Sequence, residues 1–357
     1  MEIVLLGEAY EADYEHFLHA IPTSWIYSSL KYRDFLKQIV GPQSIAYWLL
    51  LDEGEIQAAL PTMTSQAGPY GSIFNSLPFF GSNGGLLVQN PHDYPRQWKE
   101  ALFEELQAYI TRHSIASATL APHPFQDQDF RFRLPNHSFT DPRLSQITPL
   151  PASEPTRESR LDSILGLVHQ KTRNCIRKCW KSKVQISHSS SPRHLQGLFK
   201  IHRECMQAIQ GRWKPWSVFQ AIADTFDYDQ DYRLYIAEQD GELIAALLVL
   251  FYHQTAEYFI PASKAEHRTD QPMSGLVAEA MQDAMARGLT WWNWGGTWLS
   301  QKGVYHFKKR WGTLERPYRY TTAIFDDRIL SASKEPLLQA YPYFYIAPFD
   351  QIDSGPS

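Results

Sequence analysis

The strongest candidate for chemistry is a short segment near the end of the chain in which cations alternate with aromatic rings. The segment QKGVYHFKKRWG (301–312) sets Lys308 and Lys309 between Phe307 and Trp311. This spacing predicts that at least one of the two ammonium groups lies against a partly apolar wall. There a desolvated cation stabilises negative charge that develops during a reaction. The pattern also fits a plainer structure in which the rings fill a core and the lysines face solvent.

A second basic segment, KTRNCIRKCWKSK (171–183), contains six cations and no acid. Together with the preceding LDSILGLVHQ, it predicts one continuous helix with apolar positions on one side and the charges on the other. Lys171 and Arg173 begin the charged side, which suits the phosphates of tRNA or of coenzyme A. A solvated helix face is the alternative explanation of these charges.

Two glycine-rich segments follow predicted strands. Gly295 and Gly296 belong to WWNWGGTW, and SLPFFGSNGGLL (76–87) carries a similar group of glycines. Backbone N–H groups after a strand can line a cleft at the end of a sheet. A tight turn between two core elements is the other interpretation of both segments.

The elements that must position these residues occur twice. Two apolar runs joined by a short acidic turn predict a β-hairpin over 45–61 and another over 232–250. The turn glycines, Gly54 and Gly241, lie 187 residues apart. Each hairpin is followed later by a long helix and a short apolar strand, predicted at 94–113 with 115–120 and at 273–287 with LTWWNW. The order predicts an α/β fold of two tandem mixed-sheet domains that arose by duplication.

A stretch rich in proline, serine and threonine (141–158) separates the two copies and reads as a linker. We therefore expect an N-terminal domain over 1–145, a linker over 146–160 and a catalytic C-terminal domain over 161–357. The last residues, 353–357, are expected to fray.

Composition restricts the class of protein. The chain has 357 residues, 43% of them hydrophobic, and a formal charge of -4, which argues against a surface that coats nucleic acid throughout. The three cysteines suit neither a disulfide framework nor a structural zinc site. No leader-like segment or long apolar run is present, so we expect a cytoplasmic protein. P-loop, HExxH and GxSxG motifs are absent from the sequence.

Five segments together resemble the Fem family of aminoacyl-tRNA-dependent peptidyltransferases and the similar bacterial proteins of the acetyltransferase-like (GNAT) superfamily. They are SLPFFGSNGG, KTRNCIRKCWKSKVQI, YIAEQDGELIAALLVL, EYFIPASK and WWNWGGTWLSQKGVYHFKKRWG. The resemblance implies two tandem acetyltransferase-like domains. It also implies an acceptor amine that attacks an acyl ester or thioester carbonyl in a cleft of the second domain.

The same resemblance assigns roles to individual residues. Lys308 looks like the cation that meets the oxyanion, with Phe307 beside it. Tyr258 of EYFIPAS is similar in position to an aromatic ring that lines the acceptor cleft. Arg212 corresponds to an arginine that holds substrate phosphates, and Lys37 is the basic residue near the first-domain lysine of the family.

The sequence thus predicts an N-acyltransferase that forms an amide by moving an aminoacyl or acyl group to an amine. Its donor would be charged tRNA or acyl-CoA, with no tightly bound cofactor and no metal, and its acceptor an amine such as a cell-wall precursor. One alternative is a coenzyme A-dependent acyltransferase acting on a saccharide or small metabolite. Another is a noncatalytic RNA-binding protein that uses the basic segment 171–183.

Overall fold

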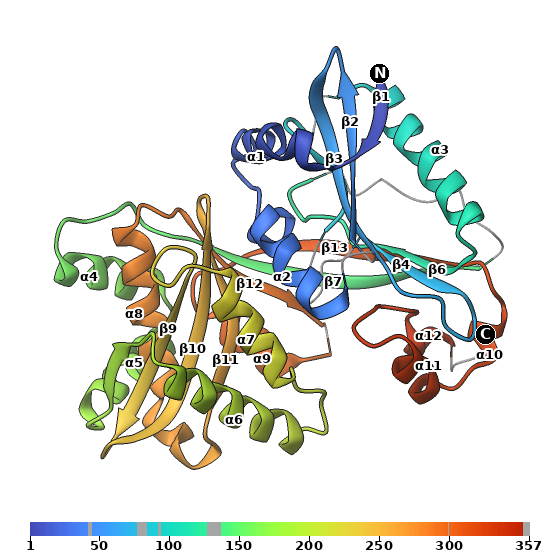
Figure 1. Ribbon diagram of the computed structural model, residues 1–357. Helices are drawn as coiled ribbons and strands as arrows, with labels where there is room; N and C mark the ends of the chain where they lie inside the picture. Colours follow the sequence, from blue (N-terminus) through green and yellow to red (C-terminus); the bar gives the residue numbers. More distant parts are fainter. Residues whose placement is uncertain (42–44, 77–83, 92–93, 127–136, 299, 353–357) are drawn as a thin grey trace. The chain divides into compact units, whose positions relative to one another are not determined.

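The computed structural model describes residues 1–41, 45–76, 84–91, 94–126, 137–298 and 300–352, which form two compact units (Figure 1). Unit 1 comprises Met1–Ser145 and Arg316–Ser357, and unit 2 comprises Gln146–Glu315. Each unit is a mixed sheet with helices packed on it, so the predicted α/β class is confirmed.

Unit 1 is built on a sheet with the strand order β1-β2-β3-β4-β6-β13, to which β5 adds by pairing with β3. Parallel pairing joins β4 to β6, and the other strands of the sheet pair antiparallel. The strands are β1 (Glu2–Leu5), β2 (Ile45–Asp52), β3 (Glu55–Thr64), β4 (Ser72–Asn75), β5 (Leu87–Val88), β6 (Ile115–Leu120) and β13 (Leu314–Ile324). The helices are α1 (Glu11–His19), α2 (Leu30–Val40), α3 (Arg96–Arg112), α10 (Arg328–Ser331), α11 (Lys334–Ala340) and α12 (Phe349–Ile352), with short 3-10 turns at Glu8–Tyr10 and Ile26–Ser28.

Unit 2 repeats this arrangement with the strand order β12-β11-β10-β9-β8, and the last residues of β7 lie next to β12. Here β11 and β12 are the parallel pair. The strands are β8 (Gln185–His188), β9 (Tyr232–Gln239), β10 (Glu242–Tyr252), β11 (Thr255–Ser263) and β12 (Trp291–Thr297), together with residues 146–149 of β7 (His137–Pro149), whose earlier residues belong to unit 1. The helices are α4 (Arg157–Leu167), α5 (Gln170–Lys181), α6 (Pro192–Ala208), α7 (Trp216–Thr225), α8 (Pro272–Ala286) and α9 (Lys302–Lys309), with a 3-10 turn at Ala265–Asp270.

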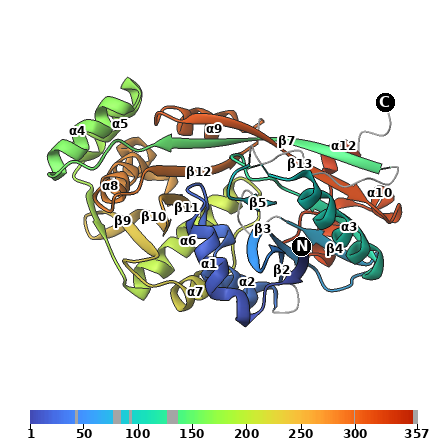
Figure 2. The ribbon, with the colours of Figure 1, turned by 90° about the horizontal axis from the view of Figure 1, so that it is seen from above.

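The helices of unit 2 cover both faces of its sheet (Figure 2). Helices α4, α5 and α8 pack on the face that carries Leu247, Trp292 and Trp294, and these residues share one hydrophobic core. Helices α6 and α7 lie on the other face, toward which the alternate residues of each strand point. The two faces therefore offer separate environments to residues that are neighbours in sequence.

Both predicted hairpins are confirmed. Strands β2 and β3 pair antiparallel on either side of the turn that holds Gly54, and β9 and β10 do so around Gly241. The two glycines adopt φ angles of 87° and 79°, which an L side chain rarely tolerates. The predicted helices and strands at 94–120 and 273–294 also form, as α3, β6, α8 and β12.

The chain divides elsewhere than the sequence suggested. Residues 316–357, which were expected in a C-terminal domain over 161–357, belong to unit 1. Asn75 of β4 holds them there, because its amide donates to the carbonyl of Tyr345 (2.8 Å) and its oxygen accepts from the N–H of Tyr345 (2.9 Å). The hydroxyl of Tyr345 also donates to Asp141 of β7 (2.7 Å). Long-range pairing of this kind has no signal in local sequence.

The expected linker over 146–160 is structured at both ends. Strand β7 runs to Pro149, and α4 begins at Arg157 behind a capping box made by Thr156 and Ser159. The single helix expected across 161–183 is also broken, because α4 ends at Leu167 and α5 starts at Gln170. His169 caps α5 by accepting from the N–H of Lys171 (3.1 Å).

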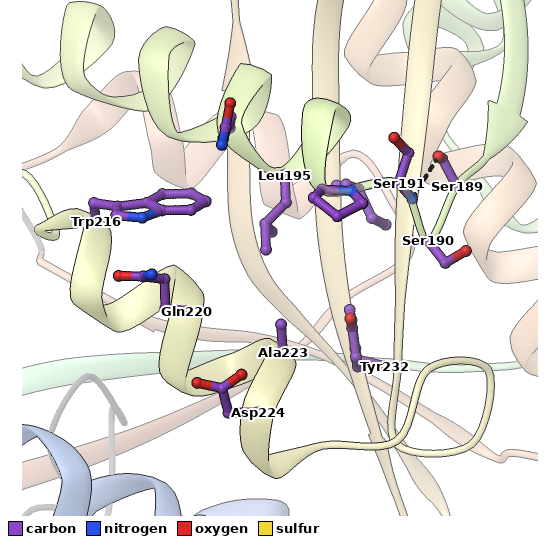
Figure 3. A pocket seen from close by; sticks show the side chains of 12 residues that line it. Ser189, Ser190, Ser191, Leu195, Trp216, Gln220, Ala223, Asp224 and Tyr232 are labelled. Carbon is purple, nitrogen blue, oxygen red and sulfur yellow. Dashed lines mark hydrogen bonds between the residues drawn. The ribbon is translucent and has the colours of Figure 1, made fainter.

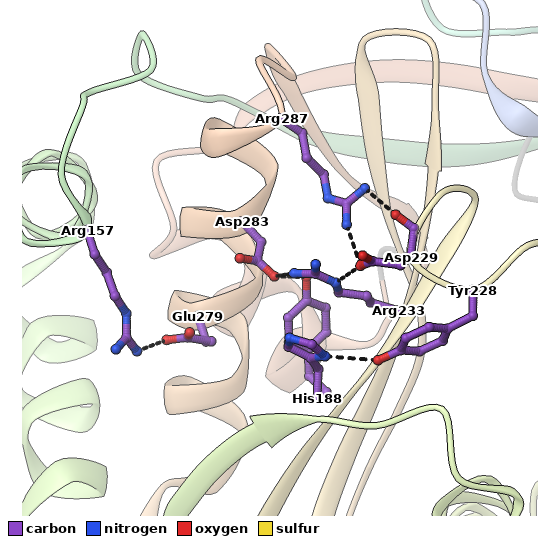
Figure 4. A network of polar contacts seen from close by, with 9 residues as sticks. Arg157, His188, Tyr228, Asp229, Arg233, Glu279, Asp283 and Arg287 are labelled. Atoms are coloured by element: carbon purple, nitrogen blue, oxygen red, sulfur yellow. Dashed lines mark hydrogen bonds and ion pairs between the residues drawn. The ribbon is translucent and has the colours of Figure 1, made fainter.

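A cluster of charges ties α8 to the edge of the sheet in unit 2 (Figure 4). Arg233 of β9 bridges Asp283 of α8 and Asp229, and Arg287 donates to the carboxylate of Asp229 at 2.9 Å. The hydroxyl of Tyr235 adds a hydrogen bond to Asp283 (2.8 Å). Burial alone would lower the pKa of Arg233, but its bonds to the two carboxylates raise it overall. The network fixes α8, which connects β11 to β12.

Within the described ranges, no helix has the length and apolar character needed to cross a membrane. The same residues contain no group of three or more acidic, histidine or cysteine side chains placed to hold a metal ion.

Candidate active site

Lys308 is a buried cation at the end of β12. It projects from α9, is only 6% exposed, and donates to the hydroxyl of Thr297 (2.9 Å) and to the carbonyl of Gly296 (3.3 Å). Both partners are neutral oxygens. The predicted desolvated ammonium is therefore present, and Lys308 is the lysine that supplies it.

Burial lowers the pKa of Lys308 from its ordinary value of 10.5 to about 8. The group is still mostly protonated near neutral pH, but its charge is poorly compensated. A cation of this kind interacts strongly with any negative charge that forms beside it, because little water screens the interaction. Lys309 is the contrast: it is exposed, and hydrogen bonds to Tyr305 and Glu315 raise its pKa.

A chain of hydrogen bonds fixes the ammonium group. The hydroxyl of Thr297 donates to the side-chain oxygen of Gln146 (3.0 Å), whose amide donates to the carbonyl of Tyr305 (3.2 Å) in α9. Thr297 and Gln146 are both fully buried. The chain closes a ring from α9 through β12 and β7 back to α9, which holds Lys308 in one orientation.

The parallel strands next to Lys308 pair only over their first residues. Thr255, Ala256 and Glu257 of β11 are in register with Trp291, Trp292 and Asn293 of β12. Beyond this point β11 continues to Ser263 and β12 to Thr297 with no further pairing between these described residues. The strands therefore separate toward the end that carries Lys308.

Two buried polar groups lie where the strands begin to separate. Glu257 is 1% exposed and accepts from the amide of Asn293 (2.9 Å), whose oxygen accepts from the N–H of Gly295 (2.9 Å). Gly295 has φ +71°, a conformation that favours glycine. The two glycines of WWNWGG thus lie within β12 rather than after it, and the carbonyl of Gly296 turns to Lys308.

An aromatic wall stands on the other face of these strands. The ring of Trp294 lies 5.0 Å from that of Tyr258, 5.9 Å from that of Phe307 and 5.7 Å from that of Trp311, centroid to centroid. Burial raises the pKa of Tyr258, so its hydroxyl stays neutral. Tyr258 and Phe307 therefore both pack against Trp294, on the opposite face of the strands from Glu257 and Asn293.

Helix α5 reaches this site at its first turn. The N–H of His169 and the hydroxyl of Thr172 both donate to the carbonyl of Arg310, at 2.9 and 3.3 Å. Lys171 is exposed there, whereas the guanidinium of Arg173 donates to the carbonyl of Leu165 (3.0 Å) and so caps the end of α4. Lys171 is available to a ligand, and Arg173 has a structural contact.

Two other expected binding residues lie outside the group of residues just described. Arg212 is exposed on the segment between α6 and α7. Lys37 lies in α2 of unit 1, where it donates to Asp34 at 3.0 Å. Most of SLPFFGSNGG, residues 77–83, falls outside the described residues.

Sequence reasoning missed Thr297, Gln146, Asn293 and Glu257. Glu257 had a usable signal, because it is the one acid inside the otherwise uncharged strand TAEYFIPAS. Gln146 had none, since it lay in a stretch that read as a linker.

The first turn of α8 is where a coenzyme phosphate would meet free N–H groups. Here it is buried under α5 and β8: Ser274 is 4% exposed, and a Cβ at Gly275 would lie 2.5 Å from the sulfur of Cys179 and 2.4 Å from Ile186. Burial raises the pKa of the Cys179 thiol to about 11, so the sulfur is a neutral packing group. These residues do not fit a phosphate.

Residues 168–309 match the family model described as an acetyltransferase (GNAT) domain, and they lie within unit 2. No curated protein sequence matched the chain.

Several solved structures share the fold. The crystal structure of FemX is 14% identical with a TM-score of 0.67, covering 95% of this chain and 99% of that one. A tandem GNAT protein from the clavulanic acid biosynthesis pathway is 13% identical with a TM-score of 0.53, covering 90% and 98%. The C-terminal domain of a candidate lysylphosphatidylglycerol synthetase from Agrobacterium fabrum is 12% identical with a TM-score of 0.51, covering 95% and 99%. Residues 168–309 thus resemble an acetyltransferase (GNAT) domain, and the chain shares the fold of FemX over 95% of its length.

Proposed function

We propose that the protein is an N-acyltransferase that forms an amide, with Lys308 as the group that stabilises the oxyanion. The observation that carries the proposal is the buried ammonium of Lys308, held by two neutral oxygens where β11 and β12 separate. A preorganised cation in such a site contributes strongly to acyl transfer, since it needs no reorganisation when the charge appears.

The reaction needs few protein groups. The nitrogen of the acceptor amine attacks the acyl carbonyl carbon, and its oxygen becomes negative beside Lys308. The C–N bond forms, the C–O bond to the donor breaks, and the leaving hydroxyl takes up the proton that the amine releases, by way of water or a substrate group. Lys308 remains protonated throughout, and orientation of the two substrates supplies much of the rate.

Replacing Lys308 by Met tests this role. We expect kcat/KM to fall by about 100- to 1,000-fold, the range typical for loss of one oxyanion donor. The variant should fold, because Met carries no charge that burial would destabilise. In the parent protein, burial lowers the pKa of Lys308 from 10.5 to about 8, and keeping the charged form there costs the folded state on the order of 3 kcal/mol. Its thermal midpoint should equal or exceed that of the parent protein.

Lys309→Met is the matched control. It removes a cation from the adjacent position, but this side chain is 54% exposed and pairs with Glu315. We expect activity close to that of the parent protein. Equal activity of the Lys308 variant and the parent would overturn the assigned role.

For the donor we propose an aminoacyl ester on tRNA in preference to acyl-CoA. The buried first turn of α8 leaves no place there for the coenzyme's pyrophosphate. Helix α5 supplies the cations that an RNA backbone needs: Lys171, Arg177, Lys178 and Lys181 are exposed, and within the described residues none of them forms an ion pair. The hydrogen bonds from His169 and Thr172 to the carbonyl of Arg310 join the first turn of α5, which carries Lys171, to the residue that follows α9, and this contact supports the proposal.

Binding measurements distinguish the two donors. Charged tRNA should bind with an affinity that falls steeply with salt, and a Lys171→Gln, Lys178→Gln, Lys181→Gln variant should reduce that slope by about three. Acetyl-CoA should neither bind nor compete. Tight binding of acetyl-CoA with salt-insensitive RNA affinity would favour the coenzyme-dependent alternative. RNA binding without any Lys308-dependent turnover would favour a noncatalytic RNA-binding protein.

A further inference from the structure

Unit 2 contains a cavity that is not lined by Lys308 or by the groups that bind it (Figure 3). It lies between the start of α6, helix α7 and strand β9, and has a volume of about 350 Å³. This is at the lower end of the ~300–1,000 Å³ typical of small-molecule pockets. Tyr232 and Leu234 place it on the face of the sheet that α6 and α7 cover, opposite the aromatic wall of Trp294.

The cavity is lined by hydrogen-bonding groups that have no protein partner. Tyr232 is only 7% exposed, and its hydroxyl makes no hydrogen bond to any residue that the structure describes. Its ring is held edge-on to Tyr228 at 5.5 Å, and Tyr228 is in turn fixed by a hydrogen bond to His188 (2.9 Å). A hydroxyl that has no protein partner can both donate to and accept from a polar ligand in the cavity.

Exposed polar side chains complete the rim. Gln220 and Asp224 of α7 and Ser190 before α6 line the cavity, and in the described part of the chain their side chains bond to nothing else. Figure 3 shows Gln220 and Asp224 on one side of Ala223 and Tyr232, with the serines at the other end. Hydroxyl, amide and carboxylate groups together accept and donate hydrogen bonds over a short span.

Charge excludes an anionic ligand. No lysine or arginine is among the lining residues, and Asp224 brings a negative charge. The N–H groups at the start of α6 are already used: those of His194 and Leu195 reach the carbonyl of Ser191, and that of Arg193 reaches its hydroxyl. The helix terminus therefore does not act as a phosphate site.

The centre of the cavity is apolar. Leu195, Leu234 and Ala223 form its walls, and the indole of Trp216 closes one end. A polar rim around an apolar centre matches a pyranose ring, whose C–H groups pack on apolar and aromatic side chains while its hydroxyls radiate outward.

We propose that this cavity is a binding site for a saccharide unit that carries no negative charge. Asp224 and Gln220 bind hydroxyls of the sugar. The hydroxyl of Tyr232 forms a further hydrogen bond to the sugar, and the indole of Trp216 packs against the edge of the sugar ring. The site is separate from Lys308, so it does not rest on the proposed acyl transfer.

Ligand-observed saturation-transfer NMR on the full chain tests the proposal with glucose, glucosamine and glucuronate as probes. We expect saturation transfer to glucose, to glucosamine or to both, and a weaker effect for glucuronate, which Asp224 repels. A stronger signal for glucosamine than for glucose would identify the ligand as an amino sugar. Equal signals for glucose and glucosamine would identify it as a neutral sugar. No transfer to any of the three sugars would overturn the proposal.

Two variants locate the binding. Tyr232→Phe removes one oxygen and Asp224→Asn one charge, and each should weaken binding by about tenfold, the effect of losing one hydrogen bond. Because Asp224 is exposed, Asp224→Asn should fold even if Tyr232→Phe does not. Unchanged binding by both variants would overturn the site. Lys308→Met should bind the sugars like the parent, which keeps this test independent of the proposed function.

Discussion

The two units carry the same parallel strand pair in two different states. In unit 1, every residue of β4 is in register with β6, and Ser76 extends the contact by donating its N–H to the carbonyl of Thr119 (2.9 Å). The hydroxyl of Ser76 then accepts from the N–H of Ala121 (2.9 Å). In unit 2, β11 and β12 pair over three positions and then separate.

The difference shows where a duplicated fold can place a reaction. A closed strand pair satisfies its own backbone groups, so nothing remains for a substrate. An open pair leaves carbonyl and N–H groups at its end, and in unit 2 the carbonyl of Gly296 is one of the groups that hold Lys308. The comparison supports our proposal that unit 2 carries the chemistry, and each of the following predictions acts on the unit with the open pair or on the unit with the closed pair.

The largest effect should come from pH, which acts on the open pair. Lys308 has a pKa of about 8, and its charge is present below that value and lost above it. On the basic side kcat/KM should fall about tenfold per pH unit, reaching about 100-fold two units above the pKa. Steady-state rates across this range check the prediction. The residual activity of Lys308→Met should lack this decline, and a flat profile for the parent protein would contradict the assigned cation.

Arg233→Met should destabilise the unit with the open pair. Strands β11 and β12 pair over only three positions, so they contribute little to holding the connecting helix α8 in place. Helix α8 therefore depends on the ion pair between its Asp283 and Arg233 of β9. Loss of a partly buried arginine that bridges two carboxylates should cost about 3 kcal/mol, measured by denaturant unfolding. Arg157→Met is the control: its side chain is 65% exposed and its guanidinium bonds to Glu279, so its loss should cost less than about 1 kcal/mol. Equal costs would show that the ion pair between Arg233 and Asp283 does not matter.

Ser76→Ala should weaken the closed pair. The change leaves the buried N–H of Ala121 without its acceptor, at a cost of about 2 kcal/mol in the free energy of unfolding. Because unit 1 holds no catalytic group in our proposal, kcat/KM should stay near the parent value at temperatures where the variant is folded. A large loss of activity without a loss of stability would assign unit 1 a part in the reaction.

Thr297→Val should produce the smallest effect, again in the open pair. It removes the hydroxyl that accepts from Lys308 and donates to Gln146, but it retains the shape of the side chain. We expect kcat/KM to fall about tenfold as Lys308 loses its fixed orientation. Thr297→Ser, which keeps the hydroxyl, should restore most of the rate. If valine and serine behave alike, the hydroxyl does not position the cation.

Much of the fold could be predicted because its signals are local. The hairpins at Gly54 and Gly241 follow from turn chemistry, and α3 and α8 follow from apolar residues at helical spacing. Local signals also misled: the charge stripe of 171–183 suggested that one helix runs on from 161, although the extended backbone of Val168 ends one helix and His169 caps the next. One long helix and two shorter helices would both carry the apolar residues on one side, so the periodicity of the sequence does not distinguish these two arrangements.

The site could be predicted in part. Lys308 could be found because its neighbours Phe307 and Trp311 predict an apolar environment, and Lys308 is buried in the structure. Thr297 and Gln146 could not be found in this way, since a single polar residue in a strand has the same local pattern whether it faces solvent or a buried cation.

The sequence by itself determined the duplicated order of strands and helices and the presence of a lysine among rings, because turn residues, periodicity and composition act over a few neighbours. Only the tertiary structure decided that residues 316–357 complete unit 1, that β11 and β12 separate, and that Gln146 reaches Lys308 through Thr297. These features depend on hydrogen bonds between residues far apart in the chain, whose energies exist only once the sheets have formed.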